Sequence, residues 1–142
     1  MPTDKTIPRE RSAYTHFTPV TLRYSDQDPM AHINNVAIAA YLESGRMGFL
    51  HHVFRDTPLP DRGMVLGRLT IDFLSEIRFP HPVDVGGRLA KVGGRSLTTQ
   101  YAVFQRERCC VVSESVNVFF DPDTRRSTEP PPEIAAILER YR

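Results

Sequence analysis

The chain has 142 residues, of which 40% are hydrophobic and 25% are charged, and its formal net charge is +1. This length suits one domain with its own core, and the composition is typical of a folded globular protein rather than a disordered one. The sequence contains no Lys/Arg-rich run, no apolar stretch long enough to cross a bilayer and no secretory segment at its start. We therefore expect a single domain over residues 1–142, a cytoplasmic location, and neither nucleic acid nor membrane as a partner.

The first part of the chain is predicted to be an arm, a strand and a loop. Residues 1–14 are expected to be a loose arm. A strand fits His16 to Tyr24, where Thr and apolar residues are frequent. The next residues, 25–29, are a cluster of turn formers and indicate a loop.

A long helix is predicted after this loop, from Asn34 or Asn35 to about Phe54. Asn is a favourable N-cap because its side-chain oxygen accepts a hydrogen bond from a free backbone N–H. Apolar residues recur at spacings of three and four and extend around much of the helix, which indicates a helix buried on most sides. The stripe consists of Ile38, Leu42, Gly45, Phe49 and Val53, and the additional apolar residues are Val36, Ala39, Ala40, Met47 and Leu50.

The rest of the chain is predicted to form strands and a C-terminal tail. Residues 69–79 have mostly apolar odd positions and mostly polar even positions, which indicates a strand with one buried face. The tail, residues 121–142, includes a short helix over residues 133–141. Between the strand at residues 69–79 and the tail, consecutive strands joined by short turns predict an antiparallel meander. These strands are at residues 83–92, 96–105 and 110–120.

This order of elements predicts an α+β fold. A single helix that is buried on most sides must be wrapped by the antiparallel sheet that follows it. Such a sheet has an open edge strand, and pairing of edges between subunits commonly covers it. We therefore expect a homo-oligomer.

The two cysteines of the chain, Cys109 and Cys110, are adjacent. Neighbouring residues of a strand point to opposite faces, so a disulfide between them would be strained. The sequence has no Cys/His set with zinc-finger spacing. We interpret the cysteines as strand thiols of a reducing compartment, and we expect no metal site.

The densest group of functional side chains lies in the segment Tyr24–Asn35, which holds two carboxylates, a histidine and two asparagines. The segment lies between a strand and the start of a helix, where free N–H groups and the helix dipole favour developing negative charge. An acid or base next to such donors suits acyl transfer, because one group activates the attack and the N–H groups hold the oxyanion.

The segment Tyr24–Arg46, with Y-S-D-Q-D-P-M-A-H-I-N-N followed by Y-L-E-S-G-R, resembles the 4-hydroxybenzoyl-CoA thioesterase-like branch of the hotdog-fold proteins. The resemblance extends from about Val20 to Pro131. It implies a hotdog fold, in which the antiparallel sheet wraps around one long central helix. It also implies an acyl-CoA thioesterase that works as a dimer or tetramer, with the active site between subunits and with coenzyme A as part of the substrate rather than a cofactor.

The same resemblance implies the roles of individual residues. Asp28, the second aspartate of D-x-D, is the expected nucleophile or general base against the thioester of a small or medium acyl-CoA. The backbone N–H that polarises the carbonyl is expected near Asn35. The sequence departs from the family at Ala31, which replaces the usual Gly, and around Ile38, which replaces an aromatic residue. Gly permits backbone angles that a methyl group opposes, so the first change puts the loop geometry in question.

The other polar residues of the motif have more than one interpretation. His32, a candidate catalytic residue, either binds substrate or tunes Asp28, or its polar groups are satisfied by the local backbone. Asn34 is first a helix cap and then a candidate substrate-binding residue. Asp26 is interpreted as structural, and Glu43 and Arg46 as a structural ion pair. No account of Glu114, which lies among the apolar even positions of its strand, emerges from the sequence.

Coenzyme A carries phosphates, so some Arg or Lys should bind them. The candidates lie near strand ends and turns: Arg95, with Ser96 beside it, and Arg126. Two other functions remain open. An enoyl-CoA hydratase on the same fold would use Asp28 and His32 as a pair, and a non-catalytic acyl-CoA or acyl-carrier binding module would bind without turnover. The acyl group, the carrier, and the choice between dimer and tetramer are also open.

Overall fold

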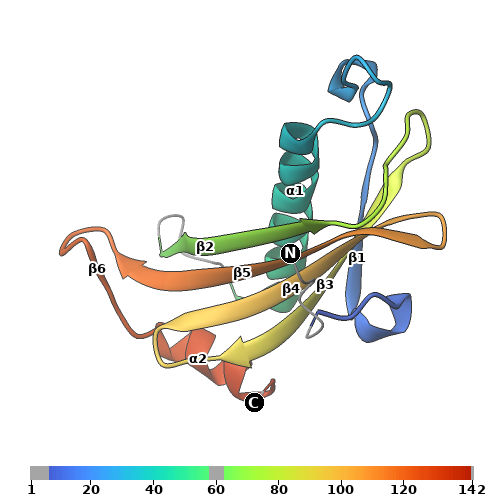
Figure 1. Ribbon diagram of the computed structural model, residues 1–142. Helices are drawn as coiled ribbons and strands as arrows, with labels where there is room; N and C mark the ends of the chain where they lie inside the picture. Colours follow the sequence, from blue (N-terminus) through green and yellow to red (C-terminus); the bar gives the residue numbers. More distant parts are fainter. Residues whose placement is uncertain (1–6, 58–62, 142) are drawn as a thin grey trace.

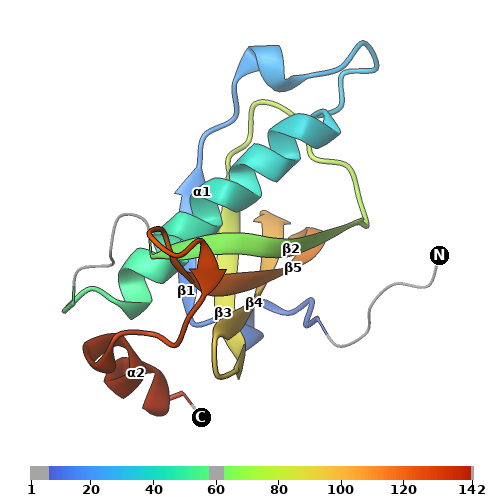
Figure 2. The same ribbon diagram turned by 90° about the vertical axis from the view of Figure 1, so that its left-hand side faces the viewer.

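A curled antiparallel sheet holds one long helix against its inner face (Figures 1 and 2). The computed structural model describes residues 7–57 and 63–141. The strand order is β1-β3-β4-β5-β2, and the short β6 pairs with β5. The elements are η1 (Arg11–Ala13), β1 (His16–Val20), η2 (Tyr24–Asp26), α1 (Asn35–Val53), β2 (Met64–Phe73), β3 (Val83–Val92), β4 (Ser96–Gln105), β5 (Arg108–Asp121), β6 (Arg126–Ser127) and α2 (Pro132–Glu139).

The meander is confirmed for β3, β4 and β5, whose predicted bounds agree with the structure to within two residues. β2 is different, because it pairs with β5 rather than with its neighbour in sequence, β3. It begins at Met64 and ends at Phe73, where the N–H groups of Leu74 and Ser75 both donate to the Cys110 carbonyl and the regular ladder stops. The prediction of a strand over residues 69–79 is therefore confirmed for residues 69–73 and wrong for residues 74–79, and it missed residues 64–68.

The predicted buried face of that strand was also wrong. Leu69 and Phe73 are 38% and 48% exposed, whereas Ile77, beyond the end of the strand, is 1% exposed. The reason is that β2 is an edge strand, so it has a neighbour on one side only. Alternation in a sequence reports which residues share a face, and it does not report whether anything covers that face.

Helix α1 has the predicted position and cap. Asn34 accepts a hydrogen bond from the N–H of Ala37 at 2.8 Å. The predicted stripe is buried against the sheet, and a side chain at Gly45 would collide with Val85, so only Gly allows this close approach. The opposite face is open, with Val36 81% and Met47 46% exposed. The expectation of burial on most sides is therefore wrong for a single chain.

The described part of the N-terminal arm is ordered, which corrects the expectation of a loose arm over residues 1–14. Ile7 and Tyr14 are 2% and 6% exposed, and they pack with Phe104 on the face of the sheet opposite α1 (Figure 2). Arg11 forms an ion pair with Asp84 at 3.2 Å. Two apolar anchors in an otherwise polar segment are thus enough to fix it. Residues 1–6 lie outside the described residues.

Three further expectations concern β1, the tail and the cysteines. The first strand ends at Val20 rather than at Tyr24, because the chain then turns into η2. The tail folds back on the sheet through α2, which buries Ile134 and Leu138. Both cysteines lie in β5 and are free thiols. Neither described α-helix has the length and apolar character of a membrane span.

Candidate active site

Asp26 anchors the loop of residues 24–34, here called the motif loop, to the rest of the molecule. Its side chain is 2% exposed and accepts hydrogen bonds from the Tyr41 hydroxyl and from the backbone and side chain of Arg23. Burial alone would raise the pKa of Asp26, but these donors outweigh it and hold the pKa below its ordinary value. The Asp26 carbonyl accepts from the backbone and side-chain N–H groups of Asn34 at 2.8 and 2.7 Å. The structural interpretation of Asp26 is confirmed.

One carboxylate oxygen of Asp28 accepts hydrogen bonds, and the other has no hydrogen-bond donor among the described residues. Its Oδ1 accepts from the backbone N–H groups of Met30 and His32 at 2.9 and 3.1 Å. Its own N–H donates to the His32 carbonyl at 2.7 Å. Among the described residues, no donor bonds Oδ2. The carboxylate is half-buried, fixed in direction, and free to act through Oδ2.

Ala31 has a backbone conformation that Gly adopts more readily than residues with a side chain. Its φ is 62°, in the left-handed region, and its N–H donates to the Asp28 carbonyl at 3.0 Å. This conformation costs a residue with a side chain about 1–2 kcal/mol. The turn around Asp28 therefore forms despite the methyl group of Ala31. Hydrogen bonds made by the side chain and backbone of Asp28 stabilise it.

The His32 ring points away from Asp28. Its Nε2 lies 3.4 Å from Oε1 of Glu76, in the segment that follows β2, and Glu76 also pairs with Arg78 at 2.6 Å. The contact of His32 with Asp28 is made by the backbone N–H of His32. This side chain therefore helps to dock the loop on the sheet, together with the bond from Ile33 N–H to the Ile77 carbonyl at 3.0 Å.

The start of α1 offers free backbone donors near this loop. The N–H groups of Ala37 and Ile38 are satisfied by the side chain and carbonyl of Asn34. Those of Asn35 and Val36 have no acceptor among the described residues, as is normal for a helix N-terminus. The side chain of Asn34 is used for the cap and for the bond to Asp26, whereas Asn35 is exposed. Two free N–H groups with the positive end of the helix dipole can hold an oxyanion.

The expected phosphate contacts lie at the other end of the sheet. Arg95 donates to the Ser127 carbonyl at 3.3 Å, next to Arg126 on β6, and Ser96 begins β4. The Asp28 loop docks near Ile77, where β2 ends and β5 begins. Along β5, the two ends are separated by about 27 Å at 3.3–3.4 Å per residue. Within one chain, the structure does not bring Arg95, Ser96 and Arg126 to Asp28.

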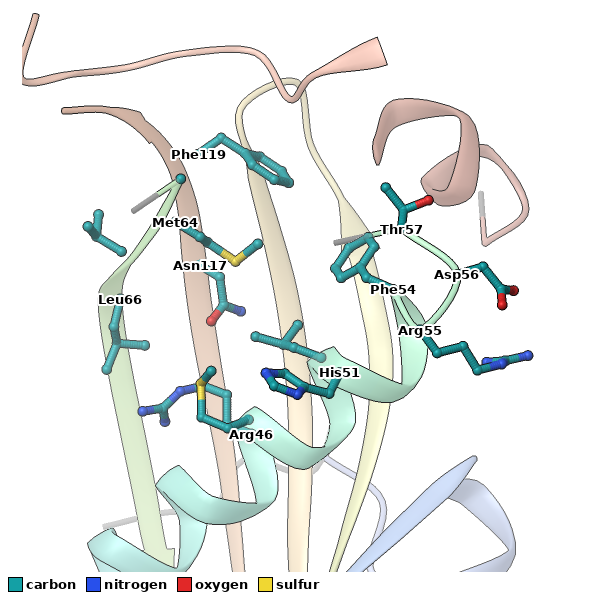
Figure 3. Close-up of a pocket in the computed structure, with 14 residues that line it drawn as sticks. Arg46, His51, Phe54, Arg55, Asp56, Thr57, Met64, Leu66, Asn117 and Phe119 are labelled. Carbon is teal, nitrogen blue, oxygen red and sulfur yellow. The ribbon is translucent and has the colours of Figure 1, made fainter. Parts of the chain in front are cut away.

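A cavity of about 910 Å³ lies between the C-terminal half of α1 and the edge strand β2 (Figure 3). Sequence reasoning missed it. A smaller cavity, of about 470 Å³, borders Asp28 in the motif loop. The one sequence signal for the larger cavity was the run of polar odd positions in β5, Ser113, Ser115 and Asn117. The side chains around the larger cavity include Arg46, Met47, Leu50, His51, Phe54, Met64, Leu66, Asn117 and Phe119.

The contacts of Glu114 answer a question that the sequence left open. Glu114 accepts a hydrogen bond from the Gln100 side chain at 2.9 Å, and Gln100 in turn accepts one from Arg88 at 2.6 Å. These residues form a polar row across the outer face of the sheet, which accounts for a carboxylate in this strand. In the part of the chain that the structure describes, no three His, Cys, Asp or Glu side chains are placed to hold a metal ion.

Comparisons with known proteins agree with this geometry. A predicted thioesterase from Bacillus stearothermophilus is 28% identical, with a TM-score of 0.78 over 87% of this chain and 93% of that chain. A thioesterase from Thermus thermophilus, solved with coenzyme A and Zn, is 26% identical, with a TM-score of 0.76 over 91% and 98%. DHNA-CoA thioesterase from Staphylococcus aureus shares the fold at 16% identity, with a TM-score of 0.77 over 88% and 89%. No curated protein sequence matches the chain.

The family assignment rests on the sequence itself. The model of the thioesterase-like superfamily matches residues 22–138, which include the motif loop, the long helix and all of the strands after it. This match confirms the hotdog fold and the expectation of a thioester hydrolase. The chain belongs to the thioesterase-like superfamily.

Proposed function

We propose that the protein hydrolyses acyl-CoA thioesters with Asp28 as its catalytic carboxylate. The observation that carries the proposal is the arrangement of this side chain: Oδ1 is held by two backbone N–H groups, and Oδ2 is open. The start of α1, with the free N–H groups of Asn35 and Val36, follows in the same loop. A fixed carboxylate and an oxyanion site are the two parts that thioester cleavage needs.

The reaction can proceed in two ways from this arrangement. As a general base, Asp28 takes a proton from water while the water oxygen attacks the thioester carbon. As a nucleophile, it forms a mixed anhydride that water then hydrolyses. In both cases the carbonyl oxygen becomes an oxyanion near the N–H groups of Asn35 and Val36, the C–S bond breaks, and the thiolate of coenzyme A leaves and takes up a proton. Neither path calls on a metal.

The contacts of His32 bear on the hydratase alternative. That reaction would require the imidazole next to the Asp28 carboxylate, and the ring instead lies at Glu76. A binding module without turnover would keep the same loop, so only a rate measurement separates it from an enzyme. Thioesterase activity is the function that this geometry supports best.

We further propose that two chains pair along β2 and complete each other's site. The exposed apolar residues of β2 and α1 support this pairing, because a second chain would bury them. An antiparallel two-fold pairing lays the start of one β2 beside the end of the other. It therefore brings the large cavity, Arg95, Ser96 and Arg126 of one protomer toward the Asp28 loop of its partner. The exposed residues are Val65, Leu66, Leu69 and Phe73 on β2, and Val36 and Met47 on α1.

The substitution Asp28→Asn tests the catalytic assignment. Asn keeps an oxygen that can accept from Met30 and His32, so the loop should stay folded, but Asn cannot act as a base or an effective nucleophile. We expect kcat for the best acyl-CoA, measured by release of free thiol, to fall by about 100-fold or more. The matched control is Asp123→Asn, an exposed aspartate in the turn before β6. A parent-like rate in Asp28→Asn would exclude Asp28 as the catalytic group.

A further inference from the structure

Arg46 is a largely buried cation, and the ion pair with Glu43 that the sequence predicts is long. Its side chain is 10% exposed, and it belongs to the stretch of α1 that faces the sheet. Its one ion-pair partner among the described residues is Glu43, at 3.8 Å, and that carboxylate is itself 72% exposed. A guanidinium has five N–H donors, and no described residue accepts a hydrogen bond from this one. Burial of a charge is costly unless hydrogen bonds compensate it, so the site is suited to an anion from outside the chain.

The sheet beneath Arg46 is polar where a hydrophobic layer would be expected. Asn117 is 3% exposed, and its amide N–H group donates to the Thr99 hydroxyl at 3.0 Å. The Ser115 hydroxyl is buried without a partner among the described residues. The Tyr101 hydroxyl donates to Thr99; burial raises the pKa of Tyr101 to about 12, and the nearby charge of Arg46 acts in the opposite direction. A polar floor therefore lies next to the guanidinium.

Of these groups, Arg46 and Asn117 line the large cavity (Figure 3). Arg46 extends from α1 toward β2 at one end of the group of lining residues, and Asn117 reaches the cavity from β5. The remaining wall combines apolar side chains with the polar side chains of His51, Arg55, Asp56 and Thr57. A plain alkyl chain would match the apolar side chains but would leave Arg46 buried and unpaired. A chain with a carboxylate at its far end would match both. The apolar wall residues are Met47, Leu50, Phe54, Met64, Leu66 and Phe119.

We propose that the cavity binds the acyl part of the substrate and that Arg46 binds a carboxylate at the end of that acyl group. The substrates are then coenzyme A monothioesters of dicarboxylic acids. This inference rests on the proposed thioesterase function and makes its substrate class specific. A guanidinium can hold a carboxylate through two parallel hydrogen bonds, which is the arrangement that Arg provides and Lys does not.

The preferred length of the acyl group depends on which protomer supplies Asp28. Arg46 lies eleven positions after Asn35, which is about 17 Å along the helix axis. A substrate attacked by Asp28 of the same chain must span that distance, whereas the proposed two-fold pairing brings the Asp28 of the partner toward the cavity and suits a shorter acyl group. The dicarboxylic acyl groups of the test, adipoyl and suberoyl, are shorter than this distance and therefore test the paired arrangement.

The test compares substrates that differ in their terminal group. kcat/KM is measured for adipoyl-CoA against hexanoyl-CoA and for suberoyl-CoA against octanoyl-CoA. We expect the parent to prefer the dicarboxylic member of the better pair by about 10- to 100-fold, the usual scale of a hydrogen bond to a charged group. Arg46→Met, which keeps an apolar side chain without charge, should abolish this preference, and Arg46→Lys should keep part of it.

Two control variants separate Arg46 from its neighbours. Glu43→Gln removes the weak ion-pair partner and should keep the preference, because the carboxylate of the substrate does not depend on Glu43. Arg55→Met removes the exposed cation that lines the same cavity and should keep it too. If Arg55→Met abolishes the preference and Arg46→Met does not, the assignment to Arg46 is overturned.

Other outcomes distinguish this inference from the proposed function. A parent that hydrolyses neutral acyl-CoAs at least as well as their dicarboxylic partners is a thioesterase without this specificity, and the inference fails. An equal loss for all substrates in Arg46→Met, with an unchanged ratio, shows a structural role and also overturns it. If the parent hydrolyses no acyl-CoA, the proposed function fails, and a binding measurement then tests the Arg46 site. In that case adipate, but not hexanoate, should raise the Tm of the parent. Adipate should change the Tm of Arg46→Met or Arg46→Lys less.

Discussion

The two ends of the sheet differ in how much of their structure one chain provides. At the Asp28 end, the motif loop is fixed by bonds to α1 and to the segment after β2, so the Asp28 carboxylate has a defined direction. At the other end, the cavity lies beside the uncovered edge of β2, and Arg46 lacks hydrogen-bond acceptors among the described residues. The comparison teaches that hydrogen bonds within one chain fix the direction of the Asp28 carboxylate, whereas one chain leaves the edge of β2 uncovered and offers the Arg46 guanidinium no hydrogen-bond acceptor among the described residues.

The largest expected effect comes from a charge on the uncovered edge. Leu69→Glu places like charges close to the two-fold axis of the proposed β2 pairing, where they repel each other. We expect the dimer to dissociate and acyl-CoA hydrolysis to fall by about 100-fold or more, as for loss of a catalytic group. Light scattering and a thiol-release assay measure the two effects. Ala90→Glu, at an exposed position of β3, is the control, and a fully active Leu69→Glu monomer would show that one chain suffices.

A second prediction concerns the hydrogen bond between Tyr41 and Asp26 at the Asp28 end. Tyr41→Phe removes a hydroxyl that donates to the buried Asp26, and the loss of a bond to a charged group should lower the free energy of unfolding by about 1.5–3 kcal/mol. Because the donors lower the pKa of Asp26 in the folded state, the stability they give is present above the unfolded pKa and is lost as pH falls through the folded one. Urea unfolding at pH 7 and at pH 3 should therefore show a smaller difference between variant and parent at pH 3. An equal difference at both values would contradict this reading.

A third, smaller effect concerns the arginines at the open end. Arg95→Ala combined with Arg126→Ala should raise KM for acyl-CoA by about 3- to 10-fold and leave kcat nearly unchanged, as expected for uniform binding of the coenzyme A phosphates. Steady-state kinetics at low salt measure the change. An unchanged KM in the double variant would remove both residues from the substrate site.

The smallest effect is expected at Ala31. Ala31→Gly relieves a left-handed conformation but adds freedom to the unfolded chain, so the net gain in the free energy of unfolding should be less than about 1 kcal/mol. Urea unfolding at equilibrium measures it. A loss of stability would mean that the Ala31 methyl group contributes contacts that outweigh the strain of its backbone.

The sequence predicted those features that depend on neighbours along the chain. The cap at Asn34, the stripe of α1 and the meander of β3 to β5 follow from local pattern, and the motif located Asp28. The edge position of β2 could not be predicted, because alternation does not reveal which strand lacks a neighbour. The cavity could not be predicted either, because Arg46 and Asn117 are 71 positions apart and meet only when α1 packs on the sheet.

The ordered arm has a practical consequence for anyone who shortens this protein. Residues 7–14 resemble a dispensable leader in composition, yet Ile7 and Tyr14 cover Phe104, Ala102 and Val112 on the outer face of the sheet. A truncated version that starts at Thr15 would present these residues to solvent. Such a patch favours self-association, so a shortened protein is expected to precipitate where the longer chain stays dispersed.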